Sequence, residues 1–281
     1  MTVAAALAAE IEAWRRRRRE RLAGEDGWLS LTGLFWLADG PNSVGAAPDA
    51  AIRLPPAAPE RAGTILLSEG RAVFAPTDPP APGLSAGGRP VEGPVELRTD
   101  AGGAPTVVAI RRVRFHLLER GGRIAVRVRD RENPARSRLG AIPSFPIDPA
   151  WRFDARFEPY DPPRRMPVTS VVGTVEEETV PGAVAFEVGS NIFRLEPVLE
   201  RGEADYWIVF GDATNGAETY GGGRFVYVSP PSGGRTVLDF NKAYNPPCVF
   251  TPYSTCPLPP PVNRLPIRVE AGEKRYRSTS D

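Results

Sequence analysis

The chain has 281 residues, of which 41% are hydrophobic and 25% charged, and its formal net charge is +1 at pH 7. Because this balance leaves no overall positive field, binding to nucleic acid or to an anionic membrane is not expected. The 32 prolines and 28 glycines favour many turns and few long helices, so the composition predicts a mainly β protein of two domains.

Apolar residues recur at helical spacing near the N-terminus and predict a helix within residues 1–26. The stripe consists of Leu7, Ile11, Trp14 and Leu22, and Gly24 is placed to cap the C-terminal end. The order of charges does not fit a signal peptide, and no apolar run approaches the roughly 20 residues that cross a membrane. A cytoplasmic location is therefore expected.

Five consecutive arginines, Arg15 to Arg19, lie on the remaining face of this helix. They could contact RNA or another phosphate. The balanced net charge favours a solvated face instead, on which an arginine pairs with Glu12 or Glu20.

Short apolar alternations separated by Gly, Pro, Asn and Asp predict a β-sandwich over residues 27–130. The order of its pieces resembles a forkhead-associated domain, with a short strand at Ala51 to Leu54 and a turn at Gly87 and Gly88. The phosphothreonine-reading residues of that family are absent, since Ala46 stands where an arginine is expected. The resemblance implies topology alone, and an interaction module of this type is one functional hypothesis.

The last strand of this sandwich has one apolar and one basic face, because Arg127 and Arg129 alternate with valines in RIAVRVRD. Arg129 is a candidate ligand-binding residue on the basic face. His116, the only histidine, is either a structural residue or a catalytic base. A single histidine does not make a metal site, and neither a metal nor a particular cofactor is predicted.

Prolines break every candidate element in residues 131–167, which predicts a packed, proline-rich crossover between the two domains. Alternation resumes from Val168 and predicts a second antiparallel sheet or small barrel over residues 168–274. Residues 275–281 are expected to fray.

Two polar stretches of this second domain are candidate binding segments. In DATNGAETYGGGRF, Tyr220 and Arg224 flank three glycines and could hold a carboxylate or phosphate, or the stretch is simply a glycine-rich hairpin. The second stretch, DFNKAYN, offers short polar groups and an aromatic ring, although such residues also cap turns. Its candidate ligand-binding residues are Asp239, Asn241, Tyr244 and Asn245.

The proline-rich segment, residues 246–265, contains both cysteines, Cys248 and Cys256, and the further candidate Tyr253. Its prolines predict a stiff, extended connection that closes the second domain. The cysteines could be buried free thiols, a disulfide worth roughly 2.5 kcal/mol by loop entropy, a nucleophile or metal ligands. With His116 they would supply at most three good ligands, fewer than a structural zinc site needs.

The stretches GWLSLTGLFWL, GRFVYV and DFNKAYNPPCVFTPYSTCPLPPPVNRLPIRVEAGEK closely resemble a bacterial family known as domain of unknown function 1684. The resemblance extends over most of the chain and implies no particular activity. It implies that the chain carries the complete hallmark of the family, which consists of Asp239, Asn241, Tyr244, Asn245, Cys248, Cys256 and Asn263.

Established catalytic motifs such as GxSxG, HExxH and the phosphate-binding loop are absent. The leading hypothesis is a protein that binds a small anionic ligand or a peptide in the second β domain, with oligomeric state undetermined. The alternative is a thiol-dependent hydrolase or transferase with Cys248 or Cys256 as nucleophile and Asp239 or His116 as base.

Overall fold

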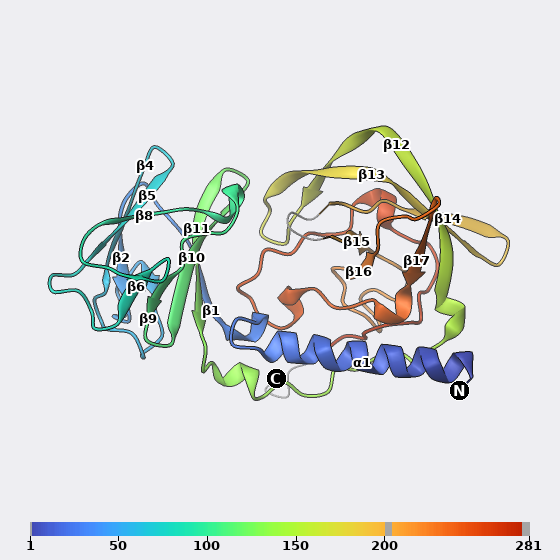
Figure 1. Ribbon diagram of the computed structural model, residues 1–281, viewed down its shortest axis with the longest axis horizontal. Coiled ribbons are helices and arrows are strands. Elements are labelled where there is room, and N and C mark those ends of the chain that lie inside the picture. The colour runs from blue at the N-terminus through green and yellow to red at the C-terminus, as the bar shows by residue number, and fades with distance from the viewer. Residues whose placement is uncertain (1, 200–203, 277–281) are drawn as a thin grey trace. The chain divides into compact units, whose positions relative to one another are not determined.

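The computed structural model describes residues 2–199 and 204–276. The protein is mainly β, as predicted, and the only α-helix of its described residues is α1, Val3–Ala23 (Figure 1). The chain divides into two compact units, one formed by Met1–Glu20 and Gly140–Asp281 and the other by Arg21–Leu139. We call them the C-terminal unit and the N-terminal unit. In the described part of the chain, no helix combines the length and the apolar character needed to cross a membrane.

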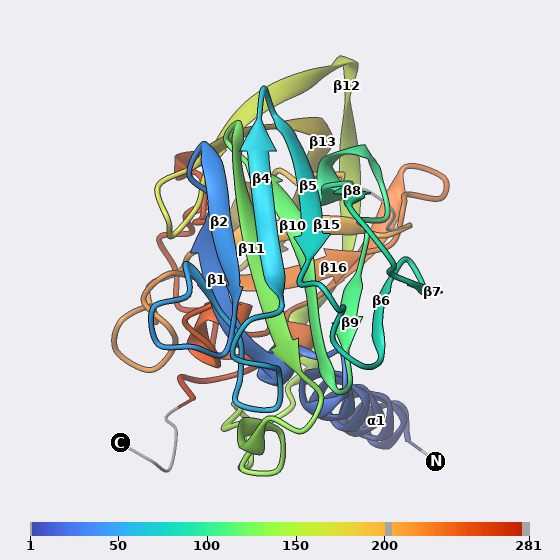
Figure 2. The same cartoon turned by 90° about the vertical axis from the view of Figure 1, so that its left-hand side faces the viewer.

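The N-terminal unit is the predicted β-sandwich, in which two sheets lie face to face (Figure 2). One sheet has the order β1-β11-β10-β9-β6-β7 and the other the order β3-β2-β4-β5-β8. The strands are β1 Leu31–Trp36, β2 Gly40–Gly45, β3 Ile52–Arg53, β4 Gly63–Ser68, β5 Arg71–Pro76, β6 Leu84–Ala86, β7 Arg89–Pro90, β8 Val95–Leu97, β9 Val108–Ile110, β10 Val113–Arg120 and β11 Arg123–Asp130.

Alternating apolar side chains of both sheets fill one core in this unit. Phe74 of β5 and Phe115 of β10 meet edge to face across it, with ring centroids 5.7 Å apart. The resemblance to a forkhead-associated domain remains a prediction.

The C-terminal unit contains a four-stranded sheet of order β14-β13-β12-β17 and a two-stranded sheet of β15 and β16. The long strands β12 and β13 arch over β15 and β16 (Figure 1), and side chains of both sheets share one core. The strands are β12 Arg152–Thr169, β13 Val175–Val188, β14 Asn191–Leu195, β15 Tyr206–Phe210, β16 Arg224–Val228 and β17 Arg235–Asp239.

The prediction that prolines break every element of residues 131–167 is wrong for the second part of this range, which lies in β12. The register between β12 and β13 shifts between Pro159 and Arg164, so Pro162 and Pro163 fall in an irregularity without ladder partners. On its other side β12 pairs with β17 only through Arg152–Arg156. Proline is tolerated where a strand edge or a bulge requires no amide donor.

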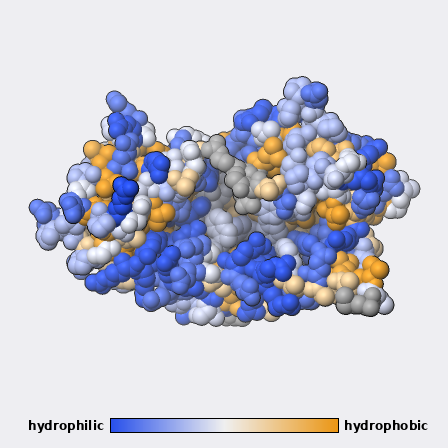
Figure 3. Space-filling model, in the orientation of Figure 1, coloured by the Kyte–Doolittle hydropathy of each residue, from blue (hydrophilic) through white to orange (hydrophobic). Residues whose placement is uncertain are grey.

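Helix α1 begins at a side-chain cap, since Thr2 Oγ1 accepts a hydrogen bond from the Ala5 amide at 3.2 Å. Its predicted stripe is confirmed: Leu7, Ile11 and Leu22 are buried and Trp14 is half-buried. The arginine-rich half of α1 belongs to a hydrophilic band, whereas its first turns are apolar (Figure 3). Arg15 pairs with Glu12 at 3.1 Å, as the solvated-face interpretation predicts.

Candidate functional site

Both cysteines lie against the side of the β15–β16 sheet that faces away from the core. Ile208 and Val226 are paired across the two strands, and both point into the core. Because side chains alternate along a strand, the residues next to them in each strand point to the opposite side. There Val209, Phe225 and Cys256 form a separate buried cluster. Three half-buried side chains pack against this cluster, namely Trp207, Tyr244 and Cys248.

The two thiols are free, and Cys248 packs against the cluster that contains Cys256. The backbone N–H of Cys248 donates to Cys256 Sγ at 3.3 Å, and Cys248 Sγ lies 3.5 Å from Tyr220 Oη. Cys256 is 4% exposed and its sulfur contacts Ser254 Oγ at 3.5 Å, whereas Cys248 is only half-buried. The predicted candidates Tyr220, Cys248 and Cys256 therefore form one site, which we call the thiol site.

The contacts of the thiol site give its three acidic groups different pKa values. The pKa of Cys248 is lowered to about 7, first of all by a hydrogen bond from Cys256 and also by one from Tyr220. Burial of Cys248 acts in the opposite direction. Hydrogen bonding to Cys248 and burial raise the pKa of Cys256, and burial first of all raises the pKa of Tyr220. Near neutral pH, Cys248 is the group that ionises, while Cys256 and Tyr220 retain their protons.

Two glycines allow Tyr220 to approach the proline-rich segment. A Cβ atom at Gly222 would lie 2.5 Å from Cε1 of the Tyr220 ring, so this position must lack a side chain. Gly223 has φ +86°, and a Cβ atom there would lie 2.3 Å from Cγ of Pro259. The glycines beside Tyr220 thus make room for the ring of Tyr220 and for a proline of the protein itself.

The tip of the β12–β13 hairpin holds the chain on both sides of Cys256. The amide of Val171 donates to the carbonyl of Cys256, and the amide of Leu258 donates to the carbonyl of Thr169, both at 2.8 Å. Ser170 and Pro257 form an isolated antiparallel bridge between these bonds. Cys256 is thus fixed through its backbone as well as its buried side chain.

Asp239, Asn241 and Asn263 bind the protein's own chain. Asp239 pairs with Arg152 at 2.7 Å and accepts from the Asn241 amide at 3.0 Å. The side chain of Asn241 exchanges two hydrogen bonds, both 2.9 Å, with the backbone of Asp148. Asn263 does the same with the backbone of Glu196 and donates also to the Val209 carbonyl. These hallmark residues hold loops in place, as their burial requires.

Asn245 is also enclosed by the protein. It is 0% exposed, its amide donates to Glu273 Oε2 at 2.7 Å and its Nδ2 donates to the Lys274 carbonyl at 2.8 Å. Tyr244 beside it is half-buried, with the guanidinium carbon of Arg18 4.3 Å from its ring centroid. Tyr253 is half-buried in a turn where its amide donates to Thr251 Oγ1 at 3.3 Å.

Arg224 is fully buried, and the prediction that it holds a ligand carboxylate or phosphate is wrong. Its guanidinium donates to the carbonyls of Val269 at 2.8 Å and Ala271 at 2.5 Å, and it pairs with Asp212 at 3.3 Å. Both side chains of this ion pair are 0% exposed. The guanidinium therefore anchors the C-terminal segment and has no surface for an external anion.

Arg129 and His116 belong to the N-terminal unit, whereas the thiol site belongs to the C-terminal unit. Arg129 donates to the carbonyls of Asp26 at 2.7 Å and Gly27 at 2.8 Å and to Ser30 Oγ at 3.1 Å. Burial, reinforced by Arg127 and Arg129, lowers the pKa of His116 to about 4. At neutral pH this imidazole is uncharged.

Sequence reasoning missed three side chains around the thiol site: Trp207, Arg18 and Glu273. Trp207 meets Phe225 edge to face, with ring centroids 4.7 Å apart. Arg18 is 9% exposed, although it belongs to the arginine run. Its spacing from Ile11, Trp14 and Leu22 was a usable signal, since position 18 falls on the apolar stripe of α1.

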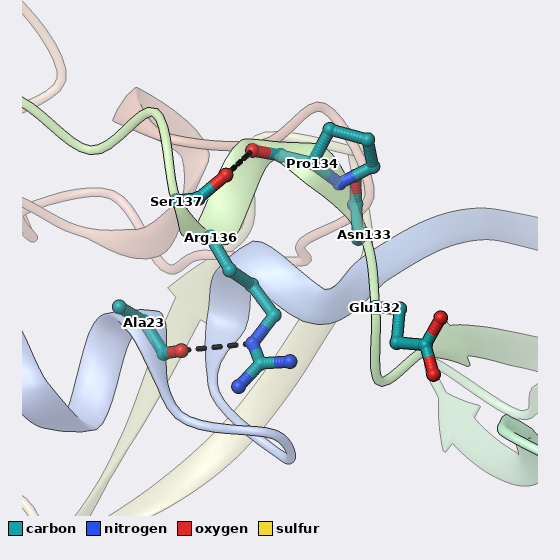
Figure 4. A pocket seen from close by; sticks show the side chains of 6 residues that line it. All are labelled: Ala23, Glu132, Asn133, Pro134, Arg136 and Ser137. Carbon is teal, nitrogen blue, oxygen red and sulfur yellow. Dashed lines mark hydrogen bonds between the residues drawn. The ribbon is translucent and has the colours of Figure 1, made fainter.

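A hollow of about 330 Å³ lies in the N-terminal unit, beside the turn of residues 132–137 (Figure 4). Its polar groups are used internally: Arg136 Nε donates to the Ala23 carbonyl at 2.8 Å and Ser137 Oγ to the Pro134 carbonyl at 3.0 Å. None of the predicted site residues lines it. Within residues 2–199 and 204–276, no three His, Cys, Asp or Glu side chains gather to hold a metal ion.

Residues 137–274 match the model of a family described as a protein of unknown function, DUF1684. This segment, which includes the thiol site, belongs to that family, as the resemblance predicted. A comparison with curated protein sequences found no match.

Among solved structures, the chain is similar to the uncharacterized protein from gene locus rrnAC0354 of Haloarcula marismortui, determined in solution by NMR. The identity is 26%, the match covers 50% of this chain and 78% of that one, and the TM-score is 0.42. Neither likeness assigns an activity.

Proposed function

We propose that the C-terminal unit carries out thiol-dependent chemistry on a small ligand, with Cys248 as the nucleophile. The observation that carries the proposal is a half-buried Cys248 thiol that lies 3.5 Å from the Tyr220 hydroxyl and next to Cys256, whose sulfur is 3.3 Å from the Cys248 backbone nitrogen. A thiolate is the reactive form of cysteine, and donors that stabilise it raise its population at neutral pH.

These contacts of Cys248 favour the second hypothesis from the sequence, a hydrolase or transferase, over simple binding of an anion. Arg224, Asn241 and Asn245, which were expected to hold such an anion, have no exposed surface. The half-buried rings of Tyr220, Tyr244 and Tyr253 remain candidates for contact with the ligand.

The reaction proposed here is addition of the Cys248 thiolate to an electrophilic atom of the ligand. In a hydrolase, water then releases the bound group, and in a transferase a second substrate does so. Tyr220, which keeps its proton, is placed to donate a hydrogen bond beside the reacting sulfur. Asp239 takes no part as a base, because it pairs with Arg152 and caps its own turn.

A small molecule or peptide is the proposed partner, and the near-neutral charge supports neither nucleic acid nor a membrane. A cytoplasmic location belongs to the same proposal, because a reducing compartment keeps both thiols free.

Alkylation kinetics test the proposal. Iodoacetamide should modify Cys248 of the folded protein with a rate that rises through a midpoint near pH 7, and Cys248→Ser should abolish this phase. Tyr220→Phe and Cys256→Ala should each move the midpoint upward, because each removes a donor to the thiolate. If both folded thiols resist alkylation, or if the midpoint equals that of a free cysteine, the proposal fails.

A further inference from the structure

We propose that Cys248 and Cys256 form a reversible dithiol pair that reduces a small hydroperoxide. The inference rests on the proposed function only in taking Cys248 as the reacting thiol. It adds the class of substrate and a role for Cys256. In an acyl or alkyl transfer by Cys248, Cys256 would have no such role.

The second sulfur of the thiol site lies close to the residue that carries the first. Cys256 Sγ lies 3.3 Å from the backbone nitrogen of Cys248, and Cys248 packs against the buried cluster that contains Cys256. A disulfide requires sulfur atoms about 2.05 Å apart and Cβ atoms about 3.8 Å apart, so two cysteines held this close need only a small movement. The hairpin bonds at Val171 and Thr169 hold Cys256 in this position.

The two sulfurs are unequally exposed. Cys248 is half-buried, whereas Cys256 is 4% exposed and packs against Val209 and Phe225. An external oxidant therefore reaches Cys248 first, and Cys256 can react only with a group already formed on its neighbour. This is the division of labour between an attacking and a resolving cysteine.

The surroundings of Cys248 favour a small oxidant. Trp207, Tyr244 and Cys248 pack against one buried cluster, and a thiol in such a half-buried position suits a small oxidant better than a folded protein with a disulfide. A hydroperoxide presents a single terminal oxygen and requires no such surface. The aromatic side chains beside the thiols also suit the organic part of an alkyl hydroperoxide.

The reaction balances as follows. The Cys248 thiolate attacks the terminal oxygen of the peroxide, the O–O bond breaks, and an S–O bond forms to give sulfenic acid at Cys248. The alkoxide leaves as an alcohol with one proton, which comes from water by way of the Tyr220 hydroxyl. The Cys256 thiol then attacks the Cys248 sulfur, releasing water and forming the disulfide, and an external dithiol restores both thiols and is itself oxidised.

The test uses the full chain, reduced and freed of reductant, and two probes, hydrogen peroxide and cumene hydroperoxide. Wild-type protein should lose two thiols and two hydrogens, measured by thiol titration and intact mass, and a dithiol should reverse the change. Cys256→Ser should stop at one added oxygen on Cys248, which dimedone traps, and Cys248→Ser should not react. A faster reaction with cumene hydroperoxide would support the alkyl class, and a faster reaction with hydrogen peroxide would favour the smaller substrate.

The inference and the proposed function fail separately. If Cys248 alkylates with a midpoint near pH 7 but peroxide oxidises it only to sulfinic acid, or not at all, the inference is overturned and the nucleophile remains. An unchanged rate of peroxide consumption by Cys248→Ser would also overturn the inference. Circular dichroism of each variant confirms that the loss of reaction is not a loss of fold.

Discussion

Arg18 and Glu273 form a buried ion pair between residues that are 255 positions apart: Arg18 Nε lies 2.7 Å from Glu273 Oε1. Only 11% and 4% of the two side chains are exposed. Arg18 also donates to the Asn245 carbonyl at 2.8 Å, and Glu273 accepts from the Asn245 amide. One pair of charges therefore joins α1, the segment before the proline-rich segment, and the C-terminal segment.

Replacement of Arg18 by alanine should lower the free energy of unfolding by about 3–5 kcal/mol, because it leaves the carboxylate of Glu273 buried without its partner. Urea denaturation followed by circular dichroism measures this loss. The matched control is Arg17→Ala on the same helix, whose exposed side chain should cost no more than about 0.5 kcal/mol. Equal effects of the two substitutions would show that Arg18 is not buried in solution.

Arg224→Ala should be at least as destabilising, by about 3–5 kcal/mol, since Asp212 would lose its cation and two backbone carbonyls their donor. Arg224→Lys should recover only part of the loss, because an ammonium cannot reach the same set of acceptors. The control is Arg268→Ala, which removes two exposed ion pairs, with Glu218 and Glu270, and should cost less than about 1 kcal/mol. A stable Arg224→Ala protein would restore Arg224 as a candidate for ligand binding.

These arginines show what could be predicted from the sequence and what could not. Position 18 falls on the apolar stripe of α1, but its partner Glu273 is too distant in the chain for any local pattern to reveal it. Arg224 stands at the start of an alternating strand, and only the fold shows that it points toward the core, with its guanidinium carbon 5.3 Å from the centroid of Phe210. A charged residue is exposed by default, and only tertiary partners overturn that default.

The mainly β class followed from the composition, and the N-terminal helix and the sandwich followed from local periodicity. The structure confirms these three predictions. The β12 strand did not, because tolerance of proline depends on which neighbouring strand requires an amide, a property of the sheet and not of the segment. For the thiol site, the sequence identified Tyr220, Cys248 and Cys256 separately. Their contact depends on the long hairpin and the β15–β16 sheet, which no sequence spacing encodes.

His116 should titrate far below the usual value. Its signals can be followed directly by proton NMR, because it is the only histidine of the chain, and the midpoint should be about 4 instead of 6.5. The unfolded chain binds the proton near pH 6.5, whereas the folded protein binds it only near pH 4. The contribution of His116 to the free energy of unfolding should therefore be fully present above this pH window. It should then fall by roughly 3 kcal/mol as the pH decreases through it.

The control for this titration is His116→Gln, which has no ionisable group at the position and should lack this part of the pH dependence. A midpoint near 6.5 in the folded protein would mean that the imidazole is not buried beside Arg127 and Arg129.

The position of the Tyr220 ring, finally, should depend on the absence of a side chain at residue 222. In Gly222→Ala the new Cβ atom would lie 2.5 Å from the ring, so the ring must move and its hydroxyl must leave Cys248 Sγ. Without this donor the pKa of Cys248 should rise, and a rise of one unit from about 7 reduces the thiolate at pH 7 about fivefold. Alkylation by iodoacetamide at pH 7 should slow accordingly.

Gly221→Ala is the matched control, because its Cβ atom would meet only Gly216, at 3.8 Å, and should leave both the ring and the alkylation rate unchanged. Tyr220→Phe should reproduce the slower rate of Gly222→Ala, and the double variant should be no slower than either alone, since both act through one hydroxyl. Additive effects would show instead that Gly222 acts on the proline-rich segment by a route that does not involve Tyr220.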